Sequence, residues 1–477
     1  MTTLPSQIAM AGIGLGGAAL LSLVVSVVTA RLLGVEQFGL YGFAFAYVSL
    51  WGVFMDAGGS VLASREVARG DSRRLLGILL AVKIPLLGLA LPLALAIGAW
   101  SGMDRLALVL VALLIVGTGI DTCFGVARGV FRGRREFGVD ALHQMGQRAL
   151  FGVLALWALL QGGGVLSVAG ARAASLALAT AVALVLLRRR GALPDPSPRL
   201  VEMRDLVRLI FPAGALLVID LMSQIQLRSG SVILRHTRDL TEVGLYTAPA
   251  RLLEGFALVP TAISVALLPR LVAAHRDHPA SAAAEVRLSL RFTAALGAGI
   301  LVALGPWASE IIELLFGAAY AASASALRLL LVVQLLMMLN AVLRAALIAT
   351  GSERAYAALM ALAGGIGVAA ALLVTPRWGA GGAAASALAG ELVLLLGGQA
   401  LSARRLPGVL PLREWGMIGA AAVLGLAAIA GAKAVTPVPA AVATLVIVLV
   451  GFEMLSPLSL REFLPRRRAA SRPPVVR

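Results

Sequence analysis

Charge is scarce in this sequence. Of its 477 residues only 14% are charged, whereas 60% are hydrophobic, and the mean hydropathy is +0.93. Soluble globular proteins are roughly one quarter charged and one half apolar. This composition leaves no room for a soluble domain of any size, and apolar runs long enough to cross a bilayer recur along the whole chain. The sequence therefore predicts a polytopic membrane protein.

Cysteine and histidine are also nearly missing. The single cysteine, Cys123, excludes an internal disulfide bond. Of the four histidines only His275 and His278 lie close together, and their spacing in a charged loop is not that of a metal site. Gly-rich pieces such as GIGLGG lack the preceding strand and the following Lys-Ser/Thr of a nucleotide loop. We expect no metal, no nucleotide and no other cofactor.

A cleavable leader is not expected either. The N-terminus has no basic segment, and its apolar part is too long for a signal-peptide core. We therefore expect a retained first span. A transmembrane helix needs about 20 mostly apolar residues, and on that basis the sequence predicts an all-α protein with about fourteen spans. Their ranges are 8–31, 40–63, 75–100, 105–128, 140–162, 165–187, 209–234, 244–269, 288–306, 324–349, 355–375, 380–402, 414–432 and 436–455.

The net charge of +17 is explained by topology and does not require a nucleic-acid partner. Lys and Arg collect in cytoplasmic loops of membrane proteins. Here arginines crowd the loops after the even-numbered spans and the C-terminal tail, whereas the loops after odd-numbered spans hold few. Both termini are therefore predicted to be cytoplasmic. The outer loops are short, so an extracellular catalytic domain, and with it an enzyme, is not expected.

An internal repeat relates the two halves of the chain. Residues 31–70 and 235–275 each carry an Arg at the end of a span, then GLY, then a span and a further Arg. Aligning GLY at 39–41 with GLY at 244–246 places Arg65 on Arg270 without a gap. Six spans separate the copies, an even number that keeps their orientation, so we expect halves related by an axis along the membrane normal.

Two stretches carry recognisable signatures. They are ARLLGVEQFGLYGFAFAYVSLWGVFMDAGGSVLASREVARG at 30–70 and LLFGAAYAASASALRLLLVVQLLMMLNAVLRAALIATGSERAY at 314–356, the second with a Phe-Gly-x-x-Tyr turn. They resemble polysaccharide-biosynthesis flippases of the multidrug/oligosaccharidyl-lipid/polysaccharide exporter superfamily. The resemblance covers nearly the whole chain. It implies two six-helix lobes around a central cavity, related by a pseudo-two-fold axis, with rocker-switch alternating access and two additional C-terminal helices.

These expectations divide the chain into five parts. The predicted parts are an N-terminal lobe at 1–190, a cytoplasmic linker at 191–208, a C-terminal lobe at 209–405, two extra helices within 406–456 and a basic tail at 457–477.

Ionisable side chains inside the predicted spans are the functional candidates, because each costs at least about 2.5–3.5 kcal/mol at membrane depth. The basic ones outnumber the acidic ones, so the interior leans positive. They are Lys83, Arg148, Arg172, Arg228, Arg251, Arg328 and Arg344 against Asp56, Asp121, Asp220, Glu254 and Glu391.

One polar stripe stands out on the seventh span. Asp220, Gln224, Arg228, Ser231 and Arg235 follow each other at steps of three or four and share one helix face. Arg228, oriented by Gln224 and Ser231, is predicted to bind an anionic head group, since a guanidinium can hold phosphate oxygens bidentately. The alternative for Arg228 is a structural ion pair between neighbouring helices. Asp220 is expected to hold that arginine when substrate is absent, or to carry a proton. Arg235 is expected to reach the outer interface.

Other candidates pair along their own helices. Arg251 and Glu254 are i,i+3 neighbours, and Asn340 and Arg344 are i,i+4 neighbours. Together with Arg148 these are further candidates for the cavity wall, although a structural ion pair is the alternative for Arg251. Asp56, Asp220 and Glu254 are the candidates for ion or proton coupling.

These features favour a flippase that moves a polyprenyl-pyrophosphate-linked oligosaccharide across the bacterial inner membrane during synthesis of O-antigen, capsule or exopolysaccharide. The expected partners are that substrate, membrane lipids, and a polymerase or glycosyltransferases of the same pathway. A multidrug antiporter needs an acidic cavity and ranks lower. A flippase for peptidoglycan precursors would need the same positively charged cavity, so the count of charges does not exclude it. A membrane glycosyltransferase, ligase or polymerase would need reactive residues in larger outer loops.

Overall fold

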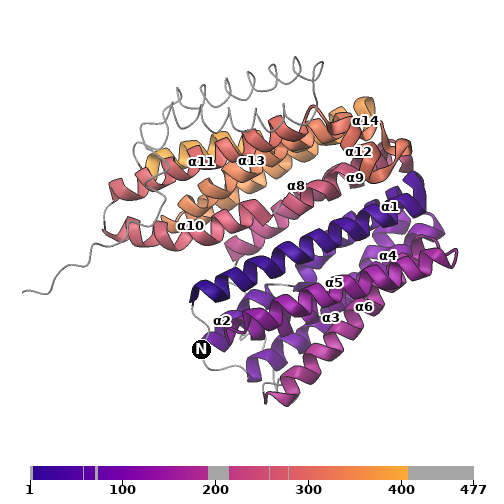
Figure 1. Ribbon diagram of the computed structural model, residues 1–477, viewed down its shortest axis with the longest axis horizontal. Coiled ribbons are helices and arrows are strands. Elements are labelled where there is room, and N and C mark those ends of the chain that lie inside the picture. Colours follow the sequence, from indigo (N-terminus) through magenta and orange to yellow (C-terminus); the bar gives the residue numbers. More distant parts are fainter. Residues whose placement is uncertain are drawn as a thin grey trace, which may run out of the picture.

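The computed structural model describes residues 4–56, 58–69, 73–191, 214–256, 258–277 and 279–406, and every regular element in these ranges is a helix (Figure 1). The first half contains α1 (Leu4–Asp56), α2 (Gly59–Arg69), α3 (Arg73–Trp100), α4 (Arg105–Gly133), α5 (Phe137–Leu160) and α6 (Val165–Arg189). The second half contains α8 (Gly214–Thr237), α9 (Leu240–Phe256), α10 (Leu258–Asp277), α11 (Pro279–Leu304), α12 (Ala308–Phe316), η2 (Ala318–Tyr320), α13 (Ser323–Ala349) and α14 (Glu353–Arg405).

Two of these helices are each too long for a single crossing. α1 and α14 have 53 residues each, about 80 Å at 1.5 Å per residue, against a hydrocarbon core of about 30 Å. Each consists of two helical segments that meet at a glycine with positive φ, Gly34 (φ 74°) and Gly379 (φ 54°). Glycine enters this region without the Cβ penalty of other residues. Both glycines lie between spans predicted as separate.

Within the described residues, helices overlie each of the first twelve predicted spans. Seven helices are long and apolar enough to cross a membrane, counting α1 and α14 once each. Most of the predicted linker at 191–208, the last two spans at 414–432 and 436–455, and the tail at 457–477 lie outside the described residues. The total of fourteen spans and the five-part division therefore stay predictions.

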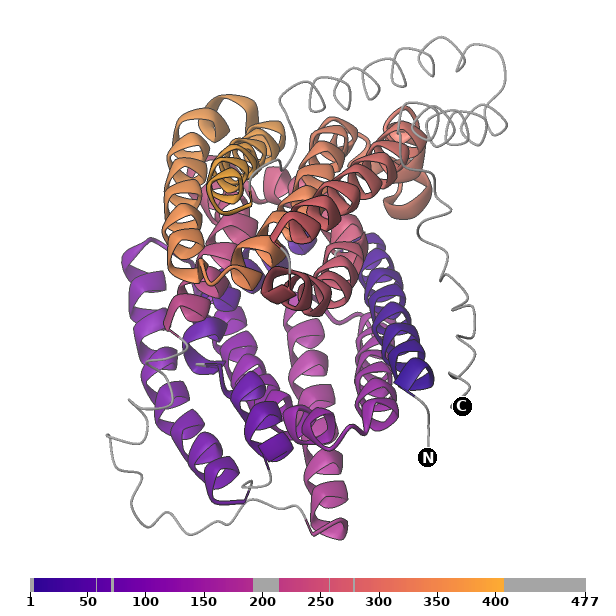
Figure 2. The ribbon, with the colours of Figure 1, turned by 90° about the vertical axis from the view of Figure 1, so that its left-hand side faces the viewer.

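The helices form two groups that follow the order of the chain. Figures 1 and 2 show α1–α6 on one side of the molecule and α8–α14 on the other. Within the groups, α4 packs on α2 and α6, and α14 packs on α8 and α13. Between the groups, α1 packs on α8 and α9. This boundary is where a cavity shared by both groups can form.

The repeated GLY segments meet at this boundary, where α1 crosses α9. A Cβ added to Gly39 would lie 1.9 Å from the Leu240 carbonyl oxygen, and one added to Gly244 would lie 2.2 Å from the Val35 carbonyl oxygen. The alignment that pairs Gly39 with Gly244 also pairs Val35 with Leu240, so the contact is reciprocal, as around a local two-fold axis. We call residues 35–42 and 240–247 the crossing.

The same end of the molecule is tied together by α12 and η2. The Arg31 guanidinium donates hydrogen bonds to the carbonyl oxygens of Leu314, at the end of α12, and of Leu315, the latter at 2.8 Å. The Tyr320 hydroxyl donates to the Ala30 carbonyl oxygen at 3.0 Å, and the Tyr320 ring packs edge-on against Phe38. These bonds join the first group of helices to the second at what we call the crossing end.

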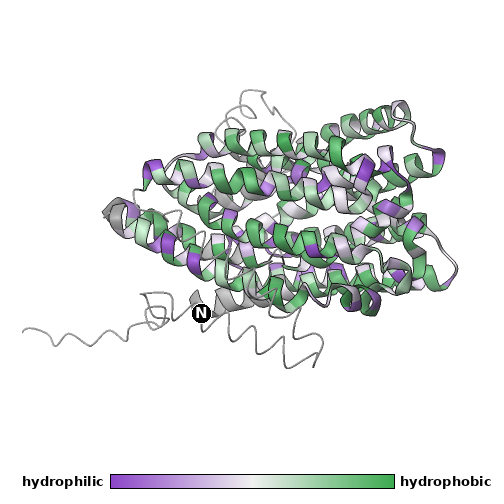
Figure 3. Cartoon of the chain, turned by 90° about the horizontal axis from the view of Figure 1, so that it is seen from above, coloured by the Kyte–Doolittle hydropathy of each residue, from purple (hydrophilic) through white to green (hydrophobic). Residues whose placement is uncertain are grey.

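The outer surface of the bundle is apolar. Large side chains such as Trp100, Leu314, Leu373 and Leu396 are exposed, and Figure 3 shows hydrophobic residues predominating along the helices. Such a surface is costly in water and suits contact with lipid chains.

Candidate anion-binding cavity

A cavity of about 300 Å³ lies at the boundary between the two groups of helices. Its polar wall combines side chains of α5, α6, α8 and α9, while α1 supplies both small hydroxyl side chains and aromatic rings. The residues that line it are Ala19, Ser22, Leu23, Val25, Ser26, Thr29, Phe38, Tyr41, Phe45, Arg148, Phe151, Arg172, Arg228, Arg251, Glu254 and Gly255. Phe38 and Tyr41 belong to the crossing, so the crossing forms one boundary of the cavity.

Glu254 binds two of the cavity arginines at once. One carboxylate oxygen accepts an N–H from Arg228 at 2.6 Å, and the other accepts an N–H from Arg251 at 2.8 Å. All three side chains are largely buried. The predicted i,i+3 pair of Arg251 and Glu254 is therefore present, and Arg228 joins it from the neighbouring helix α8.

The ring of Phe45 is the common neighbour of three arginines. The guanidinium carbons of Arg251, Arg228 and Arg172 lie 4.2, 5.2 and 5.0 Å from the ring centroid. A ring face attracts cations, by about 0.5–2 kcal/mol each depending on desolvation. Phe45 therefore helps to hold like-charged groups close together without neutralising them.

Positive charge predominates in this cavity. Among the described residues, Arg148 has no hydrogen bond or ion pair to the protein, and Arg172 has only a distant one, 3.9 Å from Asp121. The buried Nε atoms of Arg172 and Arg228 have no hydrogen-bond partner. One carboxylate, Glu254, faces four arginines, so the cavity has both the charge and the free N–H donors to bind an anion.

A second cavity of about 270 Å³ lies on the other side of Glu254, which lines both cavities. It is built from α8, α9, α13 and α14, with Pro260 of α10, and is rich in amides. Its polar lining is Ser223, Gln224, Gln226, Tyr246, Glu254, Gln334, Asn340, Arg344, Tyr356 and Glu391. Here Arg344 donates a hydrogen bond to the Ser264 hydroxyl at 3.2 Å.

The buried carboxylate of Glu391 organises the second cavity. It accepts one hydrogen bond from the Gln226 amide at 3.0 Å and one from the Asn340 amide at 2.7 Å. The Asn340 amide nitrogen also donates to the Glu391 backbone oxygen at 3.0 Å. Within the described residues no arginine or lysine lies within ion-pair distance of this carboxylate.

The structure places most of the predicted site residues in the two cavities. Arg148, Arg228, Arg251 and Glu254 share the first cavity. The second cavity contains the remaining predicted wall residues, Gln224, Asn340 and Arg344.

The two remaining candidates lie elsewhere. The expectation that Asp220 holds Arg228 is wrong, because Arg228 is bound by Glu254, while Asp220 is exposed on α8 and lines neither cavity. Spacing along α8 could not reveal a partner on another helix. Asp56 is at the end of α1.

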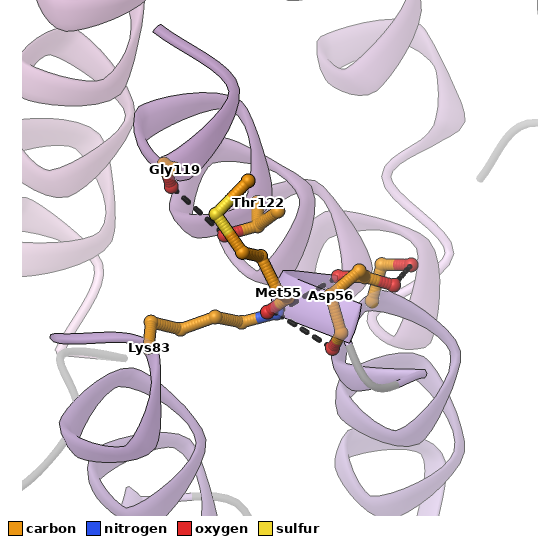
Figure 4. Close-up of polar contacts among 6 residues, drawn as sticks. Met55, Asp56, Lys83, Gly119 and Thr122 are labelled. Atoms are coloured by element: carbon orange, nitrogen blue, oxygen red, sulfur yellow. Dashed lines mark hydrogen bonds and ion pairs between the residues drawn. The ribbon is translucent and has the colours of Figure 1, made fainter. Parts of the chain in front are cut away.

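Asp56 is the last residue of α1, and Lys83 of α3 caps this end of the helix (Figure 4). The Lys83 ammonium donates to the backbone oxygens of Met55 and Asp56 at 3.2 and 2.7 Å and to the Asp56 carboxylate at 2.8 Å. A cation suits a helix C-terminus, where backbone carbonyls lack partners. Nearby Gly58 has φ 73°, so the chain leaves the helix there before α2 begins.

Two site residues were among the ionisable candidates but were not singled out from the sequence, and a third was missed. Arg172 and Glu391 carry a signal, because both are ionisable groups inside predicted spans, but neither has a polar helix face that singles it out. Phe45 carries none, since one more aromatic residue in an apolar span is not distinctive. Their importance comes from contacts between helices.

Solved structures of membrane transporters share this fold. The lipid II flippase MurJ in an inward closed conformation matches with a TM-score of 0.74 at 12% identity, over 94% of this chain and 99% of that one. An inward-facing multidrug resistance MATE transporter matches with a TM-score of 0.64 at 19% identity, over 82% and 95%. A transporter from Pyrococcus furiosus, described as having a binding pocket of reverse polarity, matches with 0.54 at 16%, over 84% and 96%.

By its fold the chain is a multi-pass integral membrane protein that resembles transporters of the multidrug/oligosaccharidyl-lipid/polysaccharide exporter superfamily. Among curated proteins none matches the sequence significantly. The pattern of the polysaccharide biosynthesis protein family, however, matches residues 7–275, more than half of the chain. The chain belongs to this family.

Proposed function

We propose that the protein is a flippase for a polyprenyl-pyrophosphate-linked oligosaccharide and that it works by alternating access in the bacterial inner membrane, in the synthesis of a surface polysaccharide. The observation that carries this proposal is the cavity at the boundary of the two helix groups, in which four arginines face one glutamate. A pyrophosphate is a compact polyanion, and arginine binds its oxygens through paired N–H donors.

The ion pairs around Glu254 suggest how binding begins. In this structure Arg228 and Arg251 donate to Glu254, while Arg148 and the Nε atom of Arg172 retain free donors. A pyrophosphate would first meet these free donors and then compete with Glu254 for the other two arginines. Substrate would thus contact both groups of helices. A ligand shifts a conformational equilibrium only if its contacts differ between the two states, and contacts to both groups would change when the groups move apart.

The crossing end is assigned to the outer face of the membrane. The arginine-rich loops lie at the opposite ends of the helices, and such loops favour the cytoplasm. With the crossing packed through Gly39 and Gly244, the outer path would be closed in this conformation. Loading would then take place from the inner side.

The charge of the cavity disfavours a carrier of cationic drugs. Such a carrier needs net negative charge around its ligand, whereas this cavity has an excess of arginine. The structurally similar Pyrococcus furiosus transporter, described as having a binding pocket of reverse polarity, is a precedent for a pocket of different polarity in this fold.

A double substitution tests the proposal. Arg228→Ala with Arg251→Ala removes half of the cavity arginines and should lower export of the surface polysaccharide at least tenfold, with lipid-linked units accumulating in the inner leaflet. The matched control is Arg105→Ala, at an exposed helix end. Export is measured on whole cells and lipid intermediates by mass spectrometry, at equal protein levels in the membrane. Full export, or unchanged intermediates together with lost dye efflux, would refute the proposal.

A further inference from the structure

The second cavity contains hydrogen-bond acceptors that the protein leaves unused. Gln224 Oε1 and Asn340 Oδ1 are buried and have no hydrogen-bond partner within the described residues. Both residues line the cavity, and Asn340 as a whole is only 5% exposed. A buried acceptor without a donor is unfavourable, so these two oxygens mark a place where a ligand can supply the donors.

Glu391 fixes which way one of these amides points. A carboxylate can only accept hydrogen bonds, so the Asn340 side chain must turn its nitrogen toward Glu391 Oε2, at 2.7 Å. The same nitrogen also donates to the Glu391 backbone oxygen. Asn340 Oδ1 is thereby committed to face away from Glu391 as an acceptor. Glu391 acts here as a positioning residue.

The two cavities differ in charge although they share Glu254. The first has an excess of arginine, whereas the second has one arginine, Arg344, beside Glu391 and the shared Glu254, and Glu391 has no ion-pair partner in the described part of the chain. A ligand that fills both cavities therefore needs an anionic part on one side of Glu254. On the other side it needs a neutral part that donates hydrogen bonds.

We propose that the second cavity binds a neutral, hydroxyl-bearing sugar of the transported unit, whose hydroxyl groups donate to Gln224 Oε1 and Asn340 Oδ1. This inference rests on the proposed function, because it takes the pyrophosphate of the same molecule to lie in the first cavity. A carboxylate on that sugar would bring no donor to the two oxygens and would approach Glu391. The site therefore discriminates against an acidic sugar at this position.

Binding to the purified full-length protein in detergent tests the subsite with three probes. They are polyprenyl pyrophosphate alone, the same lipid carrying glucose, and the same lipid carrying glucuronic acid. The glucose probe should bind at least tenfold more tightly than the bare lipid, as expected for one or two hydrogen bonds to buried acceptors. The glucuronic acid probe should bind no more tightly than the bare lipid.

Substitutions assign the effect to these residues. Gln224→Leu and Asn340→Leu should each reduce the advantage of glucose about tenfold while leaving the affinity for the bare lipid within twofold. Glu391→Gln removes the charge and should let the glucuronic acid probe bind several-fold more tightly. Gln144→Leu, an amide of α5 that lines neither cavity, is the matched control and should change none of the three affinities.

Each contrary result has a distinct meaning. Equal binding of glucose and bare probes would refute the subsite and leave the pyrophosphate cavity intact. Preference for glucuronic acid that is lost in Arg344→Gln would show that Arg344 makes this an acidic-sugar site, which also refutes the inference. If no probe binds, the bare lipid included, the proposed function itself fails.

Discussion

Glu254 has two partners where an ordinary ion pair has one. Breaking a buried pair by removing one charge costs about 3–5 kcal/mol in proteins, because the remaining charge is left without a counterion. In this cavity two arginines would be left, from α8 and α9. Glu254 thus lowers the positive charge of the cavity while it is empty, and its removal should expose that charge to substrate.

Replacing Glu254 by Gln should therefore strengthen anion binding and slow release. We expect about tenfold tighter binding of polyprenyl pyrophosphate, equivalent to about 1.4 kcal/mol, and slower flipping in proteoliposomes. Glu313→Gln, on the exposed face of α12, serves as the control. Weaker binding in Glu254→Gln would mean that Glu254 chiefly positions the arginines.

At the scale of elements, two contacts between helices control the shape of the bundle. The crossing brings the backbones of α1 and α9 together without side chains between them. The break between α1 and α2 is capped from α3 by Lys83 (Figure 4). In both places the contact involves backbone carbonyl oxygens, which cannot change rotamer to accommodate a substitution.

Gly39→Ala should open the crossing. The added Cβ would lie 1.9 Å from the Leu240 carbonyl oxygen, and overpacking of this kind costs about 1–3 kcal/mol or more. The population should shift toward conformations in which α1 and α9 separate. In a Cys123→Ser background, Ser26→Cys in the cavity wall should then react several-fold faster with an impermeant maleimide added outside the cell.

The control for this change is Gly16→Ala, because a Cβ at Gly16 would meet nothing within 4 Å. Unchanged labelling of Ser26→Cys in the Gly39→Ala protein would contradict a role of the crossing in closing the outer path.

Lys83→Met should destabilise the protein by about 1–3 kcal/mol, since the last carbonyls of α1 lose their donor. Asp56→Asn should cost less, because the Lys83 ammonium keeps both backbone oxygens and the Asp56 side chain is partly exposed. Thermal unfolding in detergent measures both. Equal losses in the two variants would show that the ion pair, rather than the helix cap, carries the stability.

At the scale of the whole molecule, the crossing end holds the two groups of helices together while the cavities lie between them. Alternating access requires this end to come apart once per cycle. A covalent bond across it should therefore stop transport without touching the cavity.

Gly42→Cys with Thr247→Cys, in the Cys123→Ser background, provides that bond. A Cβ on Gly42 would lie 3.0 Å from the Thr247 Cβ, about 0.5 Å short of the separation of about 3.5–4.5 Å found in disulfides, so a small outward shift of the helices would accommodate the bond. Oxidation should reduce flipping at least tenfold and reduction should restore it, whereas each single cysteine variant should be insensitive to oxidant. Undiminished flipping by the cross-linked protein would exclude separation at the crossing.

The helices could be predicted from the sequence, but the contacts between them could not. Apolar runs marked the elements, and the breaks at Gly34 and Gly379 lie in the gaps between the predicted spans, because span length is a local property. The pair Arg251–Glu254 was accessible for the same reason. The partner of Arg228 was not, since helical spacing says which residues share a face and nothing about which helix lies opposite. On the same grounds Arg172 and Glu391 were not singled out among the ionisable candidates, and Phe45 was missed.

The position of Phe45 makes it suitable for following the conformational change by fluorescence. Its ring lies against Arg172 of the first helix group and against Arg228 and Arg251 of the second. If the groups move as units, the ring stays with Arg172 and parts from the other two. Indole emission responds to nearby charge, so the emission maximum of a tryptophan introduced by Phe45→Trp would shift as the two groups of helices separate. The emission wavelength of a tryptophan at position 45 would therefore report the separation of the two groups of helices.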